Sequence, residues 1–315
     1  MSGKIQGAFY YLSCEDGQFK KSGDLNAEEW RKELLDMRSA GIEDMILHNT
    51  MAGGRTHFLS QRVFESWTER EPIDKLAMIM QAAEAAGVGV YLGLYHGPFL
   101  GHTDTDFDRL MKRTLNVNQL LLEELLDLYG NHPCLRGFYV PNELEEINIS
   151  WTSSRTDVLR KFFGDLYETV KKSCRLPVLI SPFFQKKTPA EEIMHCWDNF
   201  LDRSMFDIVA MQDGAGCARG VMIEEVSDRF LLFVELFRKH KITLWANIES
   251  FSMSAPEGRS KLVPAPIERR ECQWQAVRPS VERIITWEYA SCISRILVGE
   301  DWYEAFKQWN LGCKT

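Results

Sequence analysis

Several patterns that mark other protein classes are missing from these 315 residues. None of the eight cysteines forms a Cys-x-x-Cys pair, so neither a zinc knuckle nor a dense disulfide framework is indicated, and we expect reduced, mostly buried thiols. No apolar run approaches the roughly 18 residues of a membrane span. The N-terminus also lacks a basic segment followed by a long apolar stretch and a cleavage site. We therefore expect no membrane partner and a cytoplasmic location, unless a secretory signal has been removed.

Basic blocks and metal-binding spacings are missing as well. Lysine and arginine number 37 against 45 aspartates and glutamates, which gives a net charge of −8. With no Lys/Arg block, a nucleic-acid partner is not expected. No glycine-rich turn accompanied by a lysine or arginine indicates a phosphate ligand. The spacings HxH and HExxH do not occur, which disfavours a metal-dependent barrel enzyme.

The composition that remains, 45% hydrophobic and 26% charged, is typical of a globular protein with a large core. A length of 315 residues suits either two domains of about 150 residues or one long α/β barrel. Short apolar runs alternate with longer stretches of helical period, and no linker or low-complexity segment separates them. The runs are Ile5–Leu12, Ile42–His48, Val88–Tyr95, Leu135–Val140, Pro177–Pro182, Phe206–Gln212, Ile242–Ile248 and Arg283–Tyr289.

Local signals support an alternation of strands and helices. Asn26 and Glu29 form a capping-box pattern at the start of one helix. Gly41 and Gly87 stand where a helix ends and the next strand begins. A last helix near Asp301–Trp309 would pack against the final strand. Because the strand runs are almost continuously apolar, both faces are expected to be buried. The sequence therefore predicts an α/β protein, a single (β/α)8 TIM barrel occupying residues 1–315.

In such a barrel the active site lies at the carboxyl ends of the strands, so polar and aromatic residues there are candidates for substrate contacts. Neighbouring strand residues face opposite ways, so Tyr10 and Tyr11 cannot both line the cleft. Flat aromatic faces and amide or carboxylate groups suit a carbohydrate. The candidate substrate contacts are Tyr10, His48, Tyr95, His96, Asn142, Gln212, Asp213, Asn247, Trp287 and Glu288.

Two glutamates at strand ends are the candidate catalytic pair. Glu143 follows the fourth predicted strand and Glu249 follows the seventh, so they face each other across the barrel mouth. Two carboxyl groups about 5–5.5 Å apart perform double-displacement glycoside hydrolysis, with one as proton donor and the other as nucleophile. The proton donor must keep its proton near neutral pH, which burial and a neighbouring negative charge favour.

The Asn-Glu pair after strand 4 and the Glu after strand 7 resemble clan A glycoside hydrolases. Four segments in the same order are similar to those of uncharacterised bacterial barrel domains regarded as glycoside-hydrolase-like. By this resemblance Glu143 is the acid/base, Asn142 contacts the sugar 2-hydroxyl and Glu249 is the nucleophile. The sequence differs from clan A at Gln212-Asp213, where a tyrosine is common, and at Leu144, where a proline is common. The segments are Gly137-Phe-Tyr-Val-Pro-Asn-Glu, Gln212-Asp-Gly-Ala-Gly, Leu244-Trp-Ala-Asn-Ile-Glu-Ser-Phe and Ile284-Ile-Thr-Trp-Glu-Tyr.

The sequence thus predicts a retaining glycoside hydrolase that acts on a carbohydrate and needs no cofactor and no metal. One alternative is a barrel that binds carbohydrate without turnover. Another, less favoured, is a metal-dependent barrel hydrolase or isomerase that uses His48, His96 and Asp213. Asp213 has a second reading, in which it holds the Gly214–Gly216 turn instead of contacting a ligand.

Overall fold

The computed structural model describes residues 3–12, 20–52, 55–63, 73–97, 104–145, 148–149, 153–184, 187–216, 221–254 and 261–312. Eight parallel strands close into a barrel in the order β1-β12-β9-β8-β7-β6-β5-β2, which confirms the predicted (β/α)8 fold. Each strand coincides with one of the eight apolar runs, and β9 continues one residue further to include Glu249. The strands are β1 (Gly7–Tyr10), β2 (Asp44–Leu47), β5 (Gly89–Gly93), β6 (Leu135–Val140), β7 (Val178–Ile180), β8 (Ile208–Gln212), β9 (Thr243–Glu249) and β12 (Arg283–Trp287).

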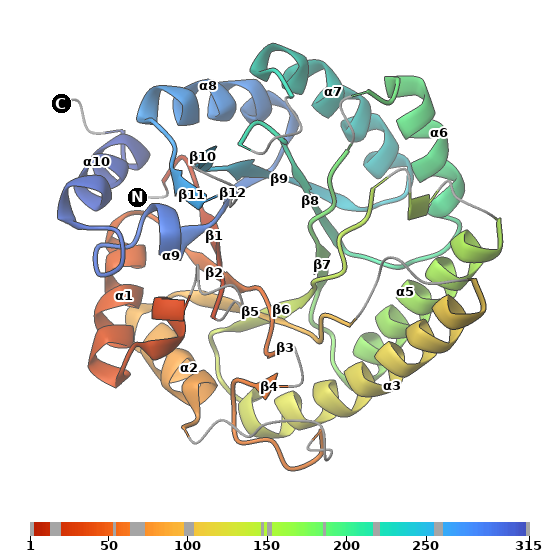
Figure 1. Cartoon of the computed structure of the whole chain (residues 1–315), viewed down its shortest axis with the longest axis horizontal. Coiled ribbons are helices and arrows are strands. Elements are labelled where there is room, and N and C mark those ends of the chain that lie inside the picture. The colour runs from red at the N-terminus through yellow and green to blue at the C-terminus, as the bar shows by residue number, and fades with distance from the viewer. Residues whose placement is uncertain are drawn as a thin grey trace.

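A ring of helices surrounds the barrel, with a helix on each crossover between consecutive barrel strands (Figure 1). The predicted capping box of α1 is present, because Asn26 accepts from the Glu29 backbone and Glu29 from the Asn26 backbone. The helices are α1 (Ala27–Ser39), α2 (Lys75–Ala86), α3 (Asp104–Tyr129), α5 (Ser153–Ser173), α6 (Ala190–Phe200), α7 (Ile223–Lys239), α8 (Ile267–Val277), α9 (Tyr289–Cys292) and α10 (Glu300–Asn310), with 3-10 turns η1 (Lys20–Asp24) and η2 (Arg278–Ser280).

Two short hairpins extend from the carboxyl ends of barrel strands. The strands β3 (Met51–Ala52) and β4 (Arg55–Thr56) pair antiparallel after β2. After β9, β10 (Phe251–Ser254) pairs with β11 (Lys261–Pro264). Among the described residues, no helix combines the length and the apolar character needed to cross a bilayer. The five described cysteines are free thiols; Cys134, Cys196 and Cys292 are buried, whereas Cys272 is exposed.

The core has two parts, because side chains of a barrel strand point alternately to the interior and to the helices. The larger part lies between the strands and the helix ring. The smaller part contains side chains from all eight barrel strands and from no helix, so it fills the barrel interior. It comprises Phe9, Ile46, Tyr91, Tyr139, Leu179, Ile208, Ala210, Trp245 and Ile285.

An ion pair closes the amino-terminal end of the interior. Arg283 on β12 approaches Asp44 on β2 to 2.6 Å, and its guanidinium lies 5.3 Å from the centre of the Trp245 ring. Burial raises the pKa of Asp44, while Arg283 opposes that shift. The carboxyl ends of the strands are the end at which barrels of this fold bind their ligands.

Asn310 joins both ends of the chain to the barrel. This buried side chain on α10 accepts from Ile5 N at 2.7 Å and donates to Ile5 O and Ala40 O at 3.0 and 2.8 Å. The N-terminal residues therefore lie beside α10, as Figure 1 shows. A single amide thus ties β1, the turn after α1 and the last helix together.

Replacing Asn310 by alanine should lower the free energy of unfolding by about 2–4 kcal/mol, because three hydrogen bonds are lost and three backbone groups lose a buried partner. Urea denaturation measures this difference. The exposed Gln308 on the same helix provides the control, since Gln308→Ala should change stability by no more than about 0.5 kcal/mol. If the two substitutions lowered the free energy of unfolding equally, Asn310 would not be the residue that ties these three elements together.

Candidate active site

An aromatic wall stands above the filled interior, at the carboxyl ends of β1, β2 and β12. The Trp287 ring lies 5.1 Å from the Phe9 ring and 5.3 Å from the His48 ring, centre to centre. The Tyr11 ring lies 4.6 Å from His48. Trp287 and Tyr11 are each partly exposed, so the wall offers accessible ring surface to a ligand.

Two histidines belong to this wall, and both are held neutral. Burial lowers the pKa of His48 to about 3, although a hydrogen bond between Nδ1 and Asn49 Oδ1 at 3.0 Å opposes the shift. The His96 ring lies 6.0 Å from His48, and the surrounding protein lowers its pKa as well, although the side chain reaches solvent. Near neutral pH these rings therefore act as hydrogen-bonding groups without charge.

The dipeptide Gln212-Asp213 at the end of β8 contacts both predicted catalytic glutamates. Gln212 Nε2 donates to Glu143 Oε1 at 3.0 Å and to Ser181 O at 2.8 Å. The next residue, Asp213, accepts from the Glu249 backbone N–H through Oδ1 at 3.1 Å. Two successive residues at the end of β8 thus contact the side chain of Glu143 and the backbone of Glu249.

Glu249 is the most firmly held of these groups. Its side chain is 2% exposed and Oε2 accepts from Gly216 N at 2.7 Å. Its backbone carbonyl accepts from Gln273 Nε2 and from Arg269 Nη2, both at 3.1 Å. Glu143, in contrast, is exposed to solvent. The two glutamates thus differ sharply in burial.

Two asparagines near the glutamates keep unused hydrogen-bonding capacity. Asn142 is 1% exposed, yet neither its amide oxygen nor its amide nitrogen has a partner among the described residues. Asn247 donates through Nδ2 to Ser181 Oγ at 2.9 Å, and within the described part of the chain its Oδ1 has no donor. Buried amides of this kind are normally paired, so a ligand hydroxyl is a fitting partner.

Tyr10 and Glu288 lie in the helix layer and not at the mouth, which corrects their assignment as substrate contacts. The Tyr10 hydroxyl donates to Glu33 at 3.1 Å and its ring packs on Trp30. Glu288 accepts from the backbone N–H groups of Ala290 and Ser291 as the N-cap of α9. Both side chains are 0% exposed. For Tyr10 the pleat of β1 is the cause, because the following residue, Tyr11, takes the inward position. Glu288 lies beyond the end of β12 and is held as the cap of α9.

Asp213 is also corrected, in favour of the alternative that it holds a turn. It is 0% exposed, and its oxygens accept from Glu249 N, Ala215 N and Gln273 Nε2. Burial raises its pKa, and these hydrogen bonds oppose the shift. Tyr95 packs against the helix-side core while remaining partly exposed, so its contact with a ligand stays a prediction.

Several groups around the site were not predicted. Strand alternation allows either Tyr10 or Tyr11 to face the mouth, and the sequence does not show which of the two faces inward. Arg269 and Gln273 lie on α8 and Gly216 lies in a loop, so no strand-end signal points to them. For Gly216 the nearest signal is the Asp-Gly-Ala-Gly sequence itself.

The described part of the chain does not support the alternative of a metal-dependent barrel enzyme. No group of three histidine, cysteine, aspartate or glutamate side chains there is placed to hold a metal ion. Of the suggested set, Asp213 is engaged by backbone and amide donors, as given above.

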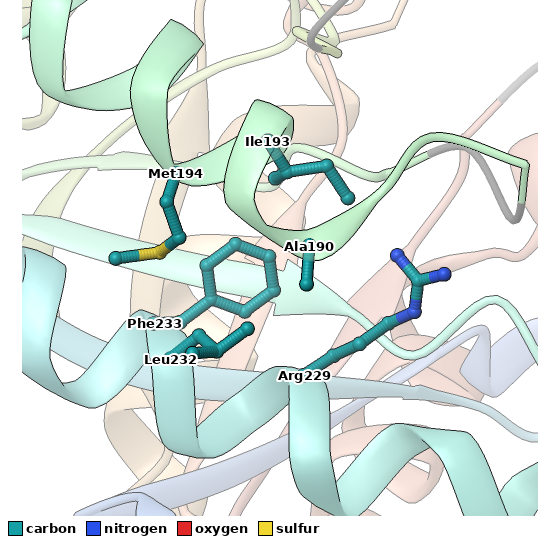
Figure 2. A pocket seen from close by; sticks show the side chains of 6 residues that line it. All are labelled: Ala190, Ile193, Met194, Arg229, Leu232 and Phe233. Atoms are coloured by element: carbon teal, nitrogen blue, oxygen red, sulfur yellow. The ribbon is translucent and has the colours of Figure 1, made fainter.

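Two hollows outside the mouth lack the character of a reaction site. One is an apolar notch between α6 and α7, seen in Figure 2, where only Arg229 carries charge. The other, about 290 Å³, lies at the amino-terminal ends of β8 and β9, where Asp207 is paired with Lys171 and His240 with Asp198. The notch is lined by Ala190, Ile193, Met194, Arg229, Leu232 and Phe233.

The fold defines a class: a (β/α)8 barrel, which here carries glutamates, amides and aromatic rings at the carboxyl ends of its strands. More particularly, residues 5–295 match the family described as a domain of unknown function (DUF4434), and the chain belongs to that family. No curated protein sequence matches the chain.

Solved structures with a similar fold include three proteins whose names are those of glycosidases. A protein from Bacteroides thetaiotaomicron described as a putative alpha-L-fucosidase has a TM-score of 0.79 at 19% identity, over 98% of this chain and 93% of its own. The Faecalibacterium prausnitzii beta-glucuronidase has a TM-score of 0.60 at 10% identity, over 99% of this chain but only 49% of its own. A GH18 chitinase from Pseudoalteromonas aurantia has a TM-score of 0.55 at 12% identity, over 97% and 99%. At these identities the likeness shows a shared fold.

Glu33, behind Tyr10, should make stability depend on pH. It is 0% exposed, and burial raises its pKa from 4.5 to about 7. The folded protein therefore binds this proton more tightly than the unfolded chain, so stability present below pH 4.5 is lost as the pH rises towards 7. Glu33→Gln keeps an acceptor for the Tyr10 hydroxyl but cannot ionise. Between pH 4.5 and 8 its free energy of unfolding should rise relative to wild type by about 3 kcal/mol.

Urea denaturation at several pH values measures this difference. The exposed Glu28 on the same helix provides the matched control variant, Glu28→Gln. A Glu33→Gln protein whose stability differs from wild type by a constant amount at every pH would show that Glu33 does not bind the proton as described.

Proposed function

We propose that this chain is a retaining glycoside hydrolase in which Glu249 is the nucleophile and Glu143 the acid/base. The observation that supports the proposal is that two adjacent residues at the end of β8 contact the two glutamates: Gln212 donates to the Glu143 carboxylate and Asp213 accepts from the Glu249 backbone N–H. Retaining glycosidases use such a pair on either side of the scissile bond.

The unequal burial of the two glutamates supports the division of roles. A nucleophile must be fixed in orientation, and Glu249 is buried with hydrogen bonds to its side chain and backbone. An acid/base must reach the departing group first and a water molecule afterwards. Glu143 is exposed to solvent, so a leaving group and a water molecule can both reach it, although it lacks the burial expected of a proton donor.

The reaction then proceeds in two displacements. Glu249 attacks the anomeric carbon as the glycosidic C–O bond breaks, and Glu143 gives its proton to the leaving oxygen. In the second step Glu143 removes a proton from water, the water oxygen bonds to the anomeric carbon, and the Glu249 carboxylate departs. Each glutamate ends in its starting state, so no cofactor is required.

The surrounding residues fit a carbohydrate substrate. The buried amide of Asn142, unpaired among the described residues, suits a sugar hydroxyl, and the resemblance to clan A enzymes makes this the 2-hydroxyl. The partly exposed rings of Tyr11 and Trp287 suit the C–H face of a sugar. His48, His96, Gln212 and Asn247 provide further hydrogen-bonding groups at or beneath the mouth.

Replacing either glutamate by glutamine should lower kcat/KM by about 10²–10⁴-fold, because a proton donor or a nucleophile is lost. The first aryl glycosides to screen are α-L-fucosides, β-glucuronides and chitooligosaccharides, after the names of the similar structures. Glu143→Gln should keep more activity on substrates with good leaving groups, which need no protonation. A 2-deoxy-2-fluoro glycoside should label Glu249.

The control is Glu145→Gln, which removes a neighbouring carboxylate and should leave the rate unchanged. Turnover by wild type that persists in both catalytic variants would overturn the assignment, and a label on another residue would move the nucleophile. Calorimetric binding of a sugar without turnover of any glycoside would favour a carbohydrate-binding barrel.

A matched pair of tyrosines tests which side of β1 faces the substrate. Tyr11→Ala should raise KM about tenfold, because one stacking ring is lost from the wall. Tyr10→Phe should leave KM unchanged and lower the free energy of unfolding by about 1 kcal/mol, because only the hydrogen bond to Glu33 is removed. Steady-state kinetics measures KM, and urea denaturation measures the free energy of unfolding. A rise in KM for Tyr10→Phe alone would reverse the orientation of the strand residues.

A further inference from the structure

The loop after β8 turns back so that its backbone reaches Glu249. Gly214 adopts a positive φ of 69°, and Ala215 N donates to Asp213 Oδ1 at 3.2 Å. These two features reverse the chain and aim the N–H of Gly216 at the Glu249 carboxylate. The resulting N···O distance of 2.7 Å is in the range of hydrogen bonds to an ionised acceptor.

Residue 216 must be glycine because of the close approach to its neighbours. A Cβ atom there would lie 2.5 Å from Phe251 O and 2.7 Å from Glu249 Cβ. Phe251 O cannot move aside easily, because it is a backbone atom of β10, which is paired with β11. The side chain is therefore absent at the one position where the backbone must touch Glu249.

The backbone of Glu249 is fixed by a separate set of contacts. Asp213 Oδ1 accepts from Glu249 N, and Gln273 Nε2 donates both to Asp213 Oδ2 at 2.7 Å and to Glu249 O at 3.1 Å. One short segment, residues 213–216, thus holds Glu249 at its backbone through Asp213 and at its carboxylate through Gly216.

We propose that Gly216 is a positioning residue for the reaction, whose backbone N–H holds the Glu249 carboxylate ionised and in the orientation needed for attack on the anomeric carbon. The inference rests on the proposed role of Glu249 as nucleophile. A hydrogen bond donated to a carboxylate favours its charged form.

The sharpest test replaces the amide at residue 216 by an ester, through incorporation of glycolic acid in cell-free translation. This change deletes the N–H and adds no atoms that could clash. We expect kcat to fall about tenfold or more with little change in KM, the effect of losing a hydrogen bond to a charged group. The acid limb of the pH–rate profile should move to higher pH, because the carboxylate loses a donor that favours ionisation.

Gly216→Ala is the second variant and should change the same two quantities in the same direction, with a larger loss of kcat. The control for general destabilisation is Asn26→Ala, which removes the cap of α1 and should cost about 1 kcal/mol of stability. It should leave the acid limb where it is. An ester protein with wild-type kcat and a wild-type acid limb would overturn the inference.

Failure of the inference can be told apart from failure of the proposed function. The glutamate carboxyl carbons can be labelled with ¹³C, and the Glu249 signal can be assigned by its disappearance in Glu249→Gln. Titration of that signal requires no turnover. A midpoint that moves upward in the ester protein supports the contact even if no glycoside is hydrolysed, whereas an unchanged midpoint overturns it even if the enzyme is active.

Discussion

The closed barrel imposes one constraint on which everything else depends: each strand side chain points either into the interior or towards the helices. The interior accepts one set of rings and aliphatic groups from all eight strands, and the other set packs under the helix ring. Neighbouring residues therefore have opposite surroundings. Tyr11 and Trp287 face the mouth, while Tyr10 and Glu288 are buried against α1 and α9.

This same constraint explains how far sequence reasoning reaches. Strands buried on both faces give long apolar runs, so all eight strands could be located, and the capping box at Asn26 placed α1. An apolar run without alternating polar residues does not show which of its side chains face the barrel interior, however. Tyr10 and Tyr11 are also chemically identical, so residue type does not distinguish them. The side of β1 that faces the mouth could not be predicted for that reason. Glu143 and Glu249 could be picked out because strand ends are marked by the end of the apolar run.

Buried carboxyl groups near the mouth have structural roles that composition does not distinguish from catalytic ones. Glu288 joins α9 to β1, because it accepts from Ala290 N, Ser291 N and Tyr11 N. Asp213 joins β8 to β9 in the same manner. In both, burial raises the pKa while several donors oppose it. A strand-end carboxylate whose two oxygens are both engaged by donors from neighbouring elements acts as a tie between those elements, so position alone does not identify a reacting group.

The helix layer takes part in the site through α8. Arg269, Arg270 and Gln273 donate to the carbonyls of three successive residues that lead from the end of β9 into β10, namely Glu249, Ser250 and Phe251. Arg270 is buried, and burial lowers its pKa to about 10, so it stays charged at neutral pH while it binds neutral carbonyls. Holding a charged guanidinium in the core costs stability. A rigid end of β9 would serve the role proposed for Glu249, since a nucleophile fixed before the substrate arrives needs no reorganisation during the reaction.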